Sequence, residues 1–301
     1  MTAPSALATA AASQHCAGGI DTSFVALGPL KVAFLGVVQG ITELLPVSST
    51  AHMRAIPALL GWPDPGSAFS AAMQLAALAA VLAYFRSDLT GLVSGSLGAL
   101  RRRDWRDHDF RLAMAIVIAT IPIAIAGALL SKVLNACHTP LRTPLLIGVA
   151  CVALAVLLGL AELSARHVRS ADRLRLRDAV LIGLAQMGAL IPGVSRSGST
   201  LTAALALGFT REDAARVAFL LGIPAIALAG FHELWELHKI GLGADGWFVL
   251  AIGLVTSSVS SFFAIWGLMR FLENFSTWPL VIYRAAFGLL LIAGAELHWF
   301  H

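Results

Sequence analysis

The sequence predicts an all-α integral membrane protein with about six transmembrane helices and two re-entrant helical hairpins, arranged as an inverted-topology repeat. Composition is the first reason: of 301 residues, 58% are hydrophobic and only 13% are charged, and the mean hydropathy is +0.81. Soluble domains carry about 25% charged residues, so this composition excludes an ordinary soluble enzyme and a disordered chain. The other two reasons are a series of long apolar runs and a pair of apolar segments with polar interruptions.

Six apolar runs are long enough to cross a bilayer, which requires about 20 residues of helix. Pro122 and Pro224 lie inside two of these runs, and membrane helices tolerate such prolines better than soluble helices do. The expected spans are 67–85, 112–131, 143–162, 213–231, 246–268 and 278–299.

The basic residues set the expected orientation of the spans. The loops Arg101–Arg111 and Arg166–Arg177 each carry five arginines, and two spans separate them. Both loops therefore lie on one side, which the positive-inside rule assigns to the cytoplasm. The loop 232–245 then lies outside. This distribution explains the net charge of +4 better than nucleic acid binding does, because no nucleic-acid motif is present.

Residues 1–29 are rich in Ala and Ser and lack the basic start of a signal peptide. We expect them to form a flexible N-terminal tail. Residues 30–301 then form a single membrane domain.

Two apolar segments are too short to span and are each interrupted by a polar break. They comprise residues 31–46 with 51–61, and 179–191 with 199–208. Such half-length pairs are typical of re-entrant hairpins, since irregular backbone at membrane depth must be buried in protein or line a cavity.

The two broken segments resemble each other at a spacing of about 146 residues, with a shared Gln and a Pro-Ser break. Three full spans lie between equivalent points, so the second copy is inverted in the membrane. Repeat one covers about 30–162 and repeat two about 179–301. Chance similarity of two Pro-containing breaks is the alternative, but inverted repeats with interrupted helices typically place a site at the repeat interface.

The first break supplies a carboxylate, hydroxyls and an imidazole. Gln39 and Glu43 are four residues apart and share a helix face, where they could present oxygen ligands to a hard cation. His52 lies within reach of Ser48 or Ser49, an arrangement that suggests nucleophilic or general-base chemistry. Thr50 lies between them.

The second break is a small-residue loop that opens into a helix. Its backbone N–H groups are suited to an anion, and Arg196 is suited to a bidentate hold on phosphate. The residues around Arg196 are Ser195, Ser197, Gly198 and Ser199. If the two hairpins meet, the combined set fits phosphoryl transfer, which depends mostly on positioning and charge neutralisation.

Structural interpretations compete with these roles. Ser and Thr often link membrane helices by hydrogen bonds, and Glu43 could form a buried ion pair with Arg54. Arg284, inside an apolar run, could pair in the interior or contact phosphate. Glu162 lies near a span end, where interfacial anchoring is the simpler interpretation.

Two stretches carry a family resemblance. The segment Gly36–His52, which reads GVVQGITELLPVSSTAH, resembles the first signature of the undecaprenyl-diphosphatase family, also called bacitracin-resistance proteins. The segment Pro192–Thr200, which reads PGVSRSGST, resembles its second signature. The resemblance covers roughly residues 30–300.

The resemblance implies an enzyme that hydrolyses undecaprenyl diphosphate to undecaprenyl phosphate and inorganic phosphate. That reaction recycles the lipid carrier of cell-wall synthesis and confers bacitracin resistance. The resemblance also implies a multi-pass protein of the bacterial cell (inner) membrane, a site open to the external, periplasmic face, and a divalent cation, Mg²⁺ or Ca²⁺.

Carried onto this chain, the resemblance assigns catalysis to Glu43, Ser49, His52 and Arg196, and the cation to Glu43 and Gln39. The phosphate-binding positions fall on Ser48, Thr50, Ser195, Ser197, Gly198 and Ser199. One departure is Gln39, where the family often has Glu: an amide brings no charge and no general base, so metal affinity could be altered. The attack could come from Ser49 with His52 as base, or from a water that His52 activates.

A secondary transporter or a lipid-carrier flippase is the alternative function, because inverted repeats and broken helices fit that class equally well. The expected partners are a prenyl diphosphate lipid and membrane lipid, with no nucleic acid. Assembly as a homodimer is left open.

Overall fold

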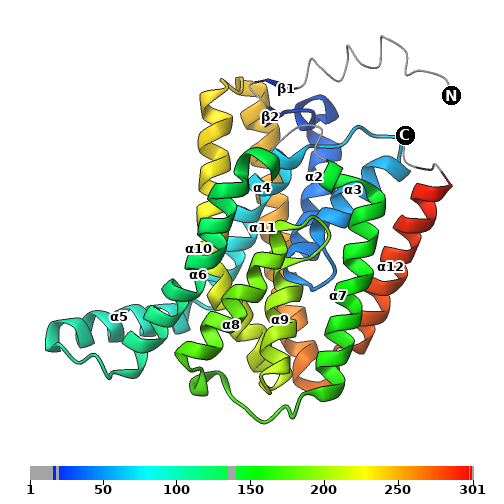
Figure 1. Cartoon of the computed structure of the whole chain (residues 1–301). Coiled ribbons are helices and arrows are strands. Elements are labelled where there is room, and N and C mark those ends of the chain that lie inside the picture. Colours follow the sequence, from blue (N-terminus) through cyan, green and yellow to red (C-terminus); the bar gives the residue numbers. More distant parts are fainter. Residues whose placement is uncertain (1–15, 18–19, 135–139, 298, 300–301) are drawn as a thin grey trace.

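The computed structural model describes residues 16–17, 20–134, 140–297 and 299. Most of the expected N-terminal tail lies outside these residues. The described part is a helical bundle (Figure 1), and its two strands are only two residues long and pair with each other. The elements in chain order are β1 Cys16–Ala17, β2 Ile20–Asp21, α2 Phe24–Leu44, α3 Ser49–Leu59, α4 Ser67–Tyr84, α5 Arg86–Arg102, α6 His108–Leu134, η1 Pro140–Arg142, α7 Pro144–Ser164, η2 Ala171–Arg173, α8 Leu176–Gln186, η3 Met187–Leu190, α9 Arg196–Ala206, α10 Arg211–Lys239, α11 Ala244–Asn274 and α12 Trp278–Glu296.

The described chain contains seven helices that are long and apolar enough to cross a membrane, one more than the six expected. The additional helix is α2, which begins at Phe24 and has 21 residues. The sequence pattern places the first apolar run from residue 31 because Gly28 and Pro29 precede it; the helix is kinked at Gly28, whose φ is 75°. Phe24 is fully buried, so α2 begins six residues before residue 30, the expected start of the membrane domain, and the short strands β1 and β2 precede it. The all-α, multi-pass membrane class is confirmed.

The two breaks are irregular segments between helices, as their polar sequences predict. In the first, the chain turns after α2 and re-enters helix at α3, with Ser48 in a left-handed conformation at φ 73°. In the second, α8 continues as η3, and Gly193 turns the chain at φ 98° before α9. Helices α3, α8 and α9 have 11 residues each, too few to cross a bilayer alone.

Equivalent elements of the two expected repeats make equivalent contacts. Helix α2 packs along α11, and its counterpart α8 packs along α6, while α4 packs against α10 and α7 against α12. Small residues permit the close approach of α2 and α11: a Cβ added at Gly40 would lie 2.4 Å from the carbonyl oxygen of Ser257. This small-residue packing is typical of helix interfaces in lipid.

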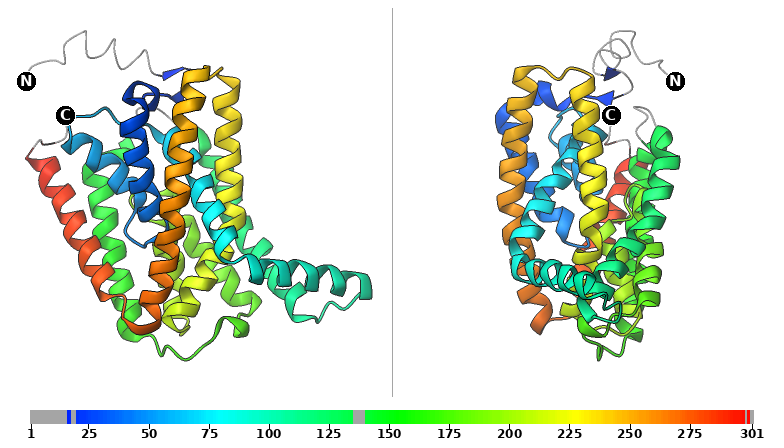
Figure 2. Two further views of the ribbon diagram at one scale, coloured as in Figure 1. Left: turned by 180° about the vertical axis from the view of Figure 1, so that it is seen from behind. Right: turned by 90° about the vertical axis from the view of Figure 1, so that its left-hand side faces the viewer.

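The two ends of the bundle differ in charge. The β1–β2 hairpin and the α10–α11 turn lie at one end, and the connections that contain η2 and join α11 to α12 lie at the other (Figures 1 and 2). The second end carries both arginine-rich loops, and we call it the basic end. Helix α5 projects sideways from the bundle there (Figure 2).

Candidate active site

The candidate site is built around Glu43, in the last turn of α2 inside the bundle. Its Oε2 accepts hydrogen bonds from Gln39 Nε2 at 3.0 Å and from Ser49 Oγ at 2.6 Å. Its Oε1 accepts from Arg196 Nη2 at 3.2 Å. Glu43 is 6% exposed. One buried carboxylate therefore joins the end of α2 to the beginnings of α3 and α9.

The second break is held directly on the first. Ser197 Oγ lies 3.1 Å from the carbonyl oxygens of both Glu43 and Leu45, and 3.0 Å from Ser195 Oγ. These contacts join residues about 150 positions apart in the chain. The two hairpins that the sequence expects to meet do so.

Arg284 of α12 holds both breaks by hydrogen bonds to their backbone carbonyls. It is fully buried, and its guanidinium donates to three backbone carbonyls, of Cys151 at 3.1 Å, Pro46 at 2.7 Å and Gly193 at 2.7 Å. Pro46 and Gly193 belong to the two breaks. Among the described residues Arg284 forms no ion pair, the first of the two roles considered for it; its guanidinium instead holds backbone carbonyls.

Both ring nitrogens of His52 have a hydrogen-bond partner, and these contacts fix the orientation of the ring. Nδ1 lies 2.8 Å from the Ser48 carbonyl, so Nδ1 carries the proton, and Nε2 then accepts from the Tyr283 hydroxyl at 2.7 Å. The ring stacks on Phe287 with centroids 4.1 Å apart. Ser49 Oγ donates to Glu43 and not to His52, so the expected Ser49–His52 pair is not formed here. Glu43 is the group placed to take a proton from Ser49.

Two helix N-termini converge on this site, those of α3 and α9. Ser48 and Ser195 are their N-caps, and each side chain accepts a backbone N–H of its own helix, from Ala51 at 3.4 Å and from Gly198 at 3.2 Å. Helix N-termini carry partial positive charge and free N–H groups. With Arg196, they create an electropositive site suited to a phosphate.

The remaining predicted phosphate ligands have other contacts. Ser199 Oγ bonds to the Arg196 carbonyl at 3.0 Å, within its own helix. Gly198 packs against Arg284, where an added Cβ would lie 2.7 Å from Nη1, so glycine is required for packing. Thr50 follows Ser49 in the first turn of α3 and is partly exposed.

Two buried polar atoms of the site have no hydrogen-bond partner within the described part of the chain: Gln39 Oε1 and Arg196 Nε. Unpaired buried polar groups are rare and costly, so both are available to a ligand. Gln39 Oε1, the Glu43 carboxylate and the Ser49 hydroxyl are oxygen donors of the kind that Mg²⁺ and Ca²⁺ prefer. No group of three His, Cys, Asp or Glu side chains suited to a metal exists among the described residues, so a cation here would complete its coordination with oxygens of substrate or water.

Arg54, the alternative partner of Glu43, lies elsewhere. It pairs with Asp64 at 2.5 Å, and Arg142 joins that carboxylate at 3.4 Å. The buried ion pair with Glu43 is formed by Arg196 instead. Sequence reasoning missed Tyr283; its position next to Arg284 in a span was the available signal.

An apolar groove of about 1010 Å³ begins beside these residues. Its inner end includes Thr42, Leu45, Val47 and Tyr283, which are direct neighbours of the site residues in sequence or contact. Its outer part lies between α2 and α11, where Val37, Ile41, Val255, Val259 and Phe263 are exposed on the flank of the bundle. The groove therefore connects the polar site with the lipid-facing surface.

Comparison with known proteins identifies the family of this chain. Residues 32–290 match the family described as bacitracin resistance protein BacA. A protein of Mesorhizobium japonicum named undecaprenyl-diphosphatase 2 is 67% identical over 87% of this chain and 99% of its own length. Proteins named undecaprenyl-diphosphatase from Gloeobacter violaceus and Synechococcus elongatus are 50% and 47% identical, over 88% and 86% of this chain and 91% and 90% of their own lengths. The chain belongs to the bacitracin resistance protein BacA family.

Proposed function

We propose that this protein removes the terminal phosphate of undecaprenyl diphosphate and so recycles the lipid carrier of cell-wall synthesis. The observation that carries the proposal is the meeting of Glu43, Ser49 and Arg196 beside an apolar groove whose lining includes their neighbours Thr42 and Leu45. A diphosphate on a prenyl chain requires this combination: an electropositive polar site joined to a lipid-accessible apolar one. The named relatives are diphosphatases, and no contact in the site favours transport.

Arg196 and the N-termini of α3 and α9 hold the diphosphate in this proposal. Arg196 Nε has no partner among the described residues, so the guanidinium can add a phosphate oxygen without losing its bond to Glu43. Burial strengthens such a contact, because the site excludes most of the water that would screen it.

Ser49 is the proposed nucleophile. Its hydroxyl oxygen attacks the terminal phosphorus, the bond from that phosphorus to the bridging oxygen breaks, and undecaprenyl phosphate leaves. The Ser49 proton passes to Glu43 Oε2, which lies 2.6 Å from Oγ. Water then cleaves the phosphoserine to release inorganic phosphate. Direct attack by a water in the place of Ser49 Oγ gives the same products, and replacement of Ser49 by Ala separates the two routes.

A divalent cation, Mg²⁺ or Ca²⁺, would be held by Glu43 and the free amide oxygen of Gln39. It would supply neutralisation of the diphosphate charge. His52, fixed by Tyr283 and the Ser48 carbonyl, holds the first turn of α3 in place.

The proposed location is the bacterial inner membrane, with the basic end in the cytoplasm and the site reached from the periplasmic end. The positive-inside rule supports this orientation, because both arginine-rich loops lie at the same end of the bundle. Labelling of single cysteines in intact cells with an impermeant reagent tests it: positions in 232–245 should react and positions in 101–111 should not.

Phosphate release from undecaprenyl diphosphate by purified protein in detergent tests the proposed function. Wild-type protein with Mg²⁺ or Ca²⁺ should release phosphate, and Glu43→Ala should release almost none. Glu236→Ala is a matched control, because that carboxylate pairs only with Lys239 near the far end of α10 within the described structure. Release at the wild-type rate by Glu43→Ala would contradict the proposal.

A further inference from the structure

The basic end of the molecule carries an arm that the proposed reaction does not use. The arm comprises α5 and the connection 103–107 that leads to α6. After α4 ends at Tyr84, the chain turns at Phe85 and α5 runs sideways, across the direction of the spans, before the chain returns below it (Figure 1). At 1.5 Å per residue, its 17 residues reach about 25 Å.

One face of the arm is apolar and exposed. Val93, Leu97 and Leu100 are 56%, 52% and 50% exposed and lie at helical spacing, so they form one stripe. The opposite face of α5, around Gly95, packs on α6, where an added Cβ would collide with the Asp109 side chain. Trp105, at the tip of the arm, is also exposed. Exposed apolar stripes of this kind normally have a partner.

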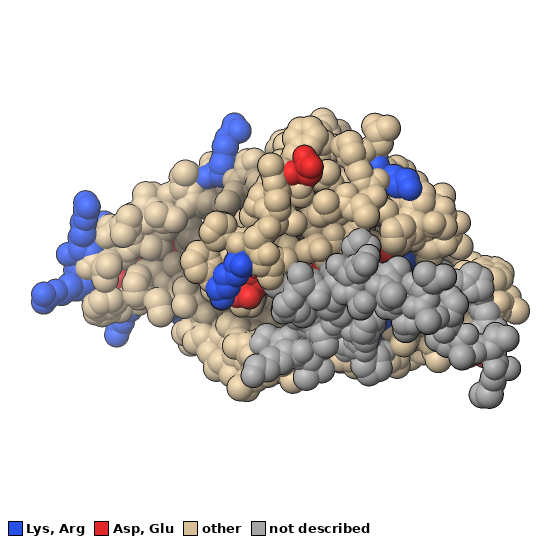
Figure 3. All heavy atoms as spheres, turned by 90° about the horizontal axis from the view of Figure 1, so that it is seen from above, with Lys and Arg blue, Asp and Glu red and all other residues tan. Residues whose placement is uncertain are grey.

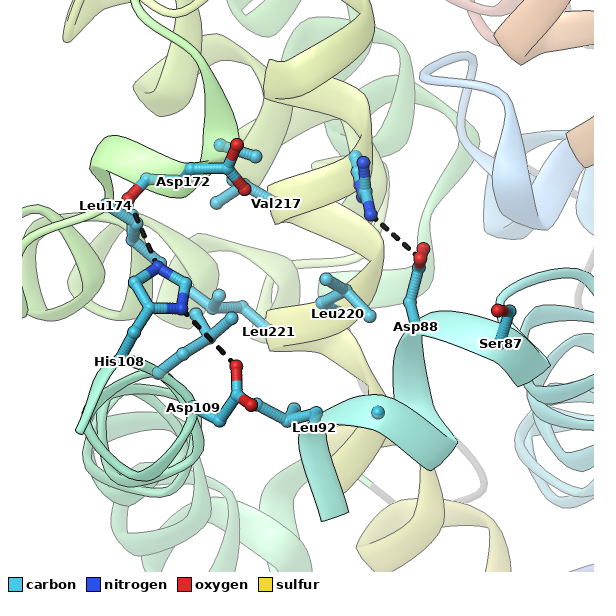
Figure 4. A pocket seen from close by; sticks show the side chains of 14 residues that line it. Ser87, Asp88, Leu92, His108, Asp109, Asp172, Leu174, Val217, Leu220 and Leu221 are labelled. Carbon is cyan, nitrogen blue, oxygen red and sulfur yellow. Dashed lines mark hydrogen bonds and ion pairs between the residues drawn. The ribbon is translucent and has the colours of Figure 1, made fainter. Parts of the chain in front are cut away.

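Contacts at the root of the arm fix its direction. Asp88 of α5, labelled in Figure 4, pairs with Arg216 of α10 at 2.8 Å. Figure 4 also shows His108 of α6 bound to the Asp172 carbonyl of η2, at 3.3 Å. These side chains line a pocket of about 310 Å³ between the arm and the bundle. The arm is therefore tied on two sides and held across the spans.

Positive charge surrounds the apolar stripe. Arg86 precedes it, and Arg101, Arg102, Arg103 and Arg106 follow it, all of them exposed. Seen along the spans from the opposite end, the Lys and Arg side chains gather on the projecting arm at the left, whereas the bundle shows only scattered ones (Figure 3). An apolar stripe bordered by arginines is complementary to an anionic lipid surface, where acyl chains take the apolar side chains and phosphates take the guanidinium groups.

We infer that the arm lies in the headgroup region of the leaflet at the basic end and binds anionic phospholipid. The stripe Val93–Leu97–Leu100 enters the acyl boundary and the five arginines contact lipid phosphates. The arm then fixes the depth of the bundle in the membrane. The inference uses the same orientation as the proposed function but none of its chemistry.

A fluorescence experiment on the full-length protein tests the inference. Val93→Cys and Gly91→Cys are made in a Cys16→Ser/Cys137→Ser background, which leaves the buried Cys151 in place. Each is labelled with an environment-sensitive fluorophore and reconstituted in nanodiscs of phosphatidylcholine, with or without about 30% phosphatidylglycerol. Gly91 is the matched control because it lies two positions from Val93, almost opposite on the helix, and an added Cβ there meets nothing within 4 Å.

In anionic nanodiscs, lipid-borne doxyl groups should quench the label at position 93 at least about threefold more than at 91, and aqueous iodide should do the reverse. Replacement of Arg101, Arg102, Arg103 and Arg106 by Gln should abolish the added effect of phosphatidylglycerol. Phosphate release in detergent should remain normal in all these variants, so a failure of the proposed function is detected separately.

Three results would overturn the inference. Equal iodide quenching at 93 and 91 in both lipid compositions would show that the stripe faces water. Lipid quenching at position 93 that is equal with and without phosphatidylglycerol would show that anionic lipid is not the partner of the arm. Disulfide cross-linking between two copies at position 93, with no lipid quenching, would show that a second copy covers the stripe.

Discussion

Two buried carboxylate–arginine pairs join distant parts of this chain, and they differ in how completely they are satisfied. At the basic end, Glu162 accepts from Arg211 Nε at 2.7 Å and Nη2 at 2.5 Å, and its second oxygen accepts from Thr277 at 2.9 Å. In the candidate site, Arg196 gives Glu43 a single bond of 3.2 Å, and Arg196 Nε has no partner among the described residues.

The difference separates a structural pair from one built to receive a ligand. In the Glu162 pair two guanidinium donors share one carboxylate oxygen and a hydroxyl donates to the other, so the pair has little to offer a substrate, and its removal destabilises the fold. A buried pair in which one N–H donor has no acceptor makes the folded state less stable. A ligand that accepts from that donor offsets the loss. Glu162 was expected to anchor a span end at the interface; it instead fastens α7 to α10 and to the residue that precedes α12.

The largest expected effect is on activity at the unsatisfied pair. Arg196→Ala should lower the rate of phosphate release by about 10³-fold or more, since an arginine that stabilises phosphoryl-transfer charge contributes about that much. The melting temperature in detergent should fall less than in Arg211→Ala, because Glu43 keeps its hydrogen bonds from Gln39 and Ser49. Stopped assays on undecaprenyl diphosphate at saturating substrate measure the rate. A loss confined to KM, with kcat intact, would show that Arg196 serves ground-state binding alone.

Breaking the Glu162–Arg211 pair should lower the stability of the protein and leave its activity unchanged. Arg211→Ala leaves Glu162 buried with Thr277 and, at 4.0 Å, His167 as its remaining partners. We expect unfolding to become easier by about 3 kcal/mol, the low end for a broken buried pair, because the Arg211 side chain is 32% exposed. Phosphate release per folded molecule should remain normal. Thermal melts together with activity of the soluble fraction measure both. Lost activity at unchanged stability would contradict the comparison.

Arg284 combines the two roles and should show an intermediate effect. Arg284→Lys keeps the charge but lacks the planar fork that reaches three carbonyls, so the two breaks should shift apart. We expect kcat to fall about 10–100-fold, as for residues that position catalytic groups, with KM less affected. If kcat falls equally in Arg284→Lys and Arg284→Leu, the role of Arg284 is general packing. If kcat falls less in Arg284→Lys than in Arg284→Leu, the positive charge contributes.

A second carboxylate beside Glu43 should produce the smallest effect. Gln39→Glu adds an anionic oxygen at the proposed cation site, and we expect half-maximal activity at about tenfold lower free Mg²⁺, which corresponds to about 1.4 kcal/mol. The Mg²⁺ dependence of phosphate release, with free metal set by a chelator, measures this shift. An unchanged Mg²⁺ dependence would remove Gln39 from the proposed cation site.

Much of this arrangement can be predicted from the sequence. The low charge, the long apolar runs and the two polar breaks predict the membrane bundle, and the motifs around Glu43 and Arg196 predict that the breaks meet. These features are local in sequence, and hydropathy and residue type report them directly.

The remainder depends on tertiary contacts that no local pattern reports. The span α2 is longer than its apolar run predicts because Phe24 and Leu27 are buried before a kink at Gly28. The serine-rich second break supplies a cap and an internal helix bond as well as donors, because Ser195 and Ser199 bond to backbone groups of their own helix, whereas Ser197 reaches carbonyls of the first break. Tyr283 reaches His52 only because α12 packs beside α3, 231 residues away in sequence.

The most direct test of the account is a matched Arg→Lys substitution at the two pairs. Arg196→Lys and Arg211→Lys each keep one positive charge, and each removes the guanidinium fork. At equal amounts of folded protein in detergent, Arg196→Lys should release phosphate from undecaprenyl diphosphate at least about 100-fold more slowly than wild type, and Arg211→Lys should remain within about twofold of it. A wild-type rate for Arg196→Lys, or the larger loss in Arg211→Lys, would contradict the claim that the unsatisfied pair is the phosphate site.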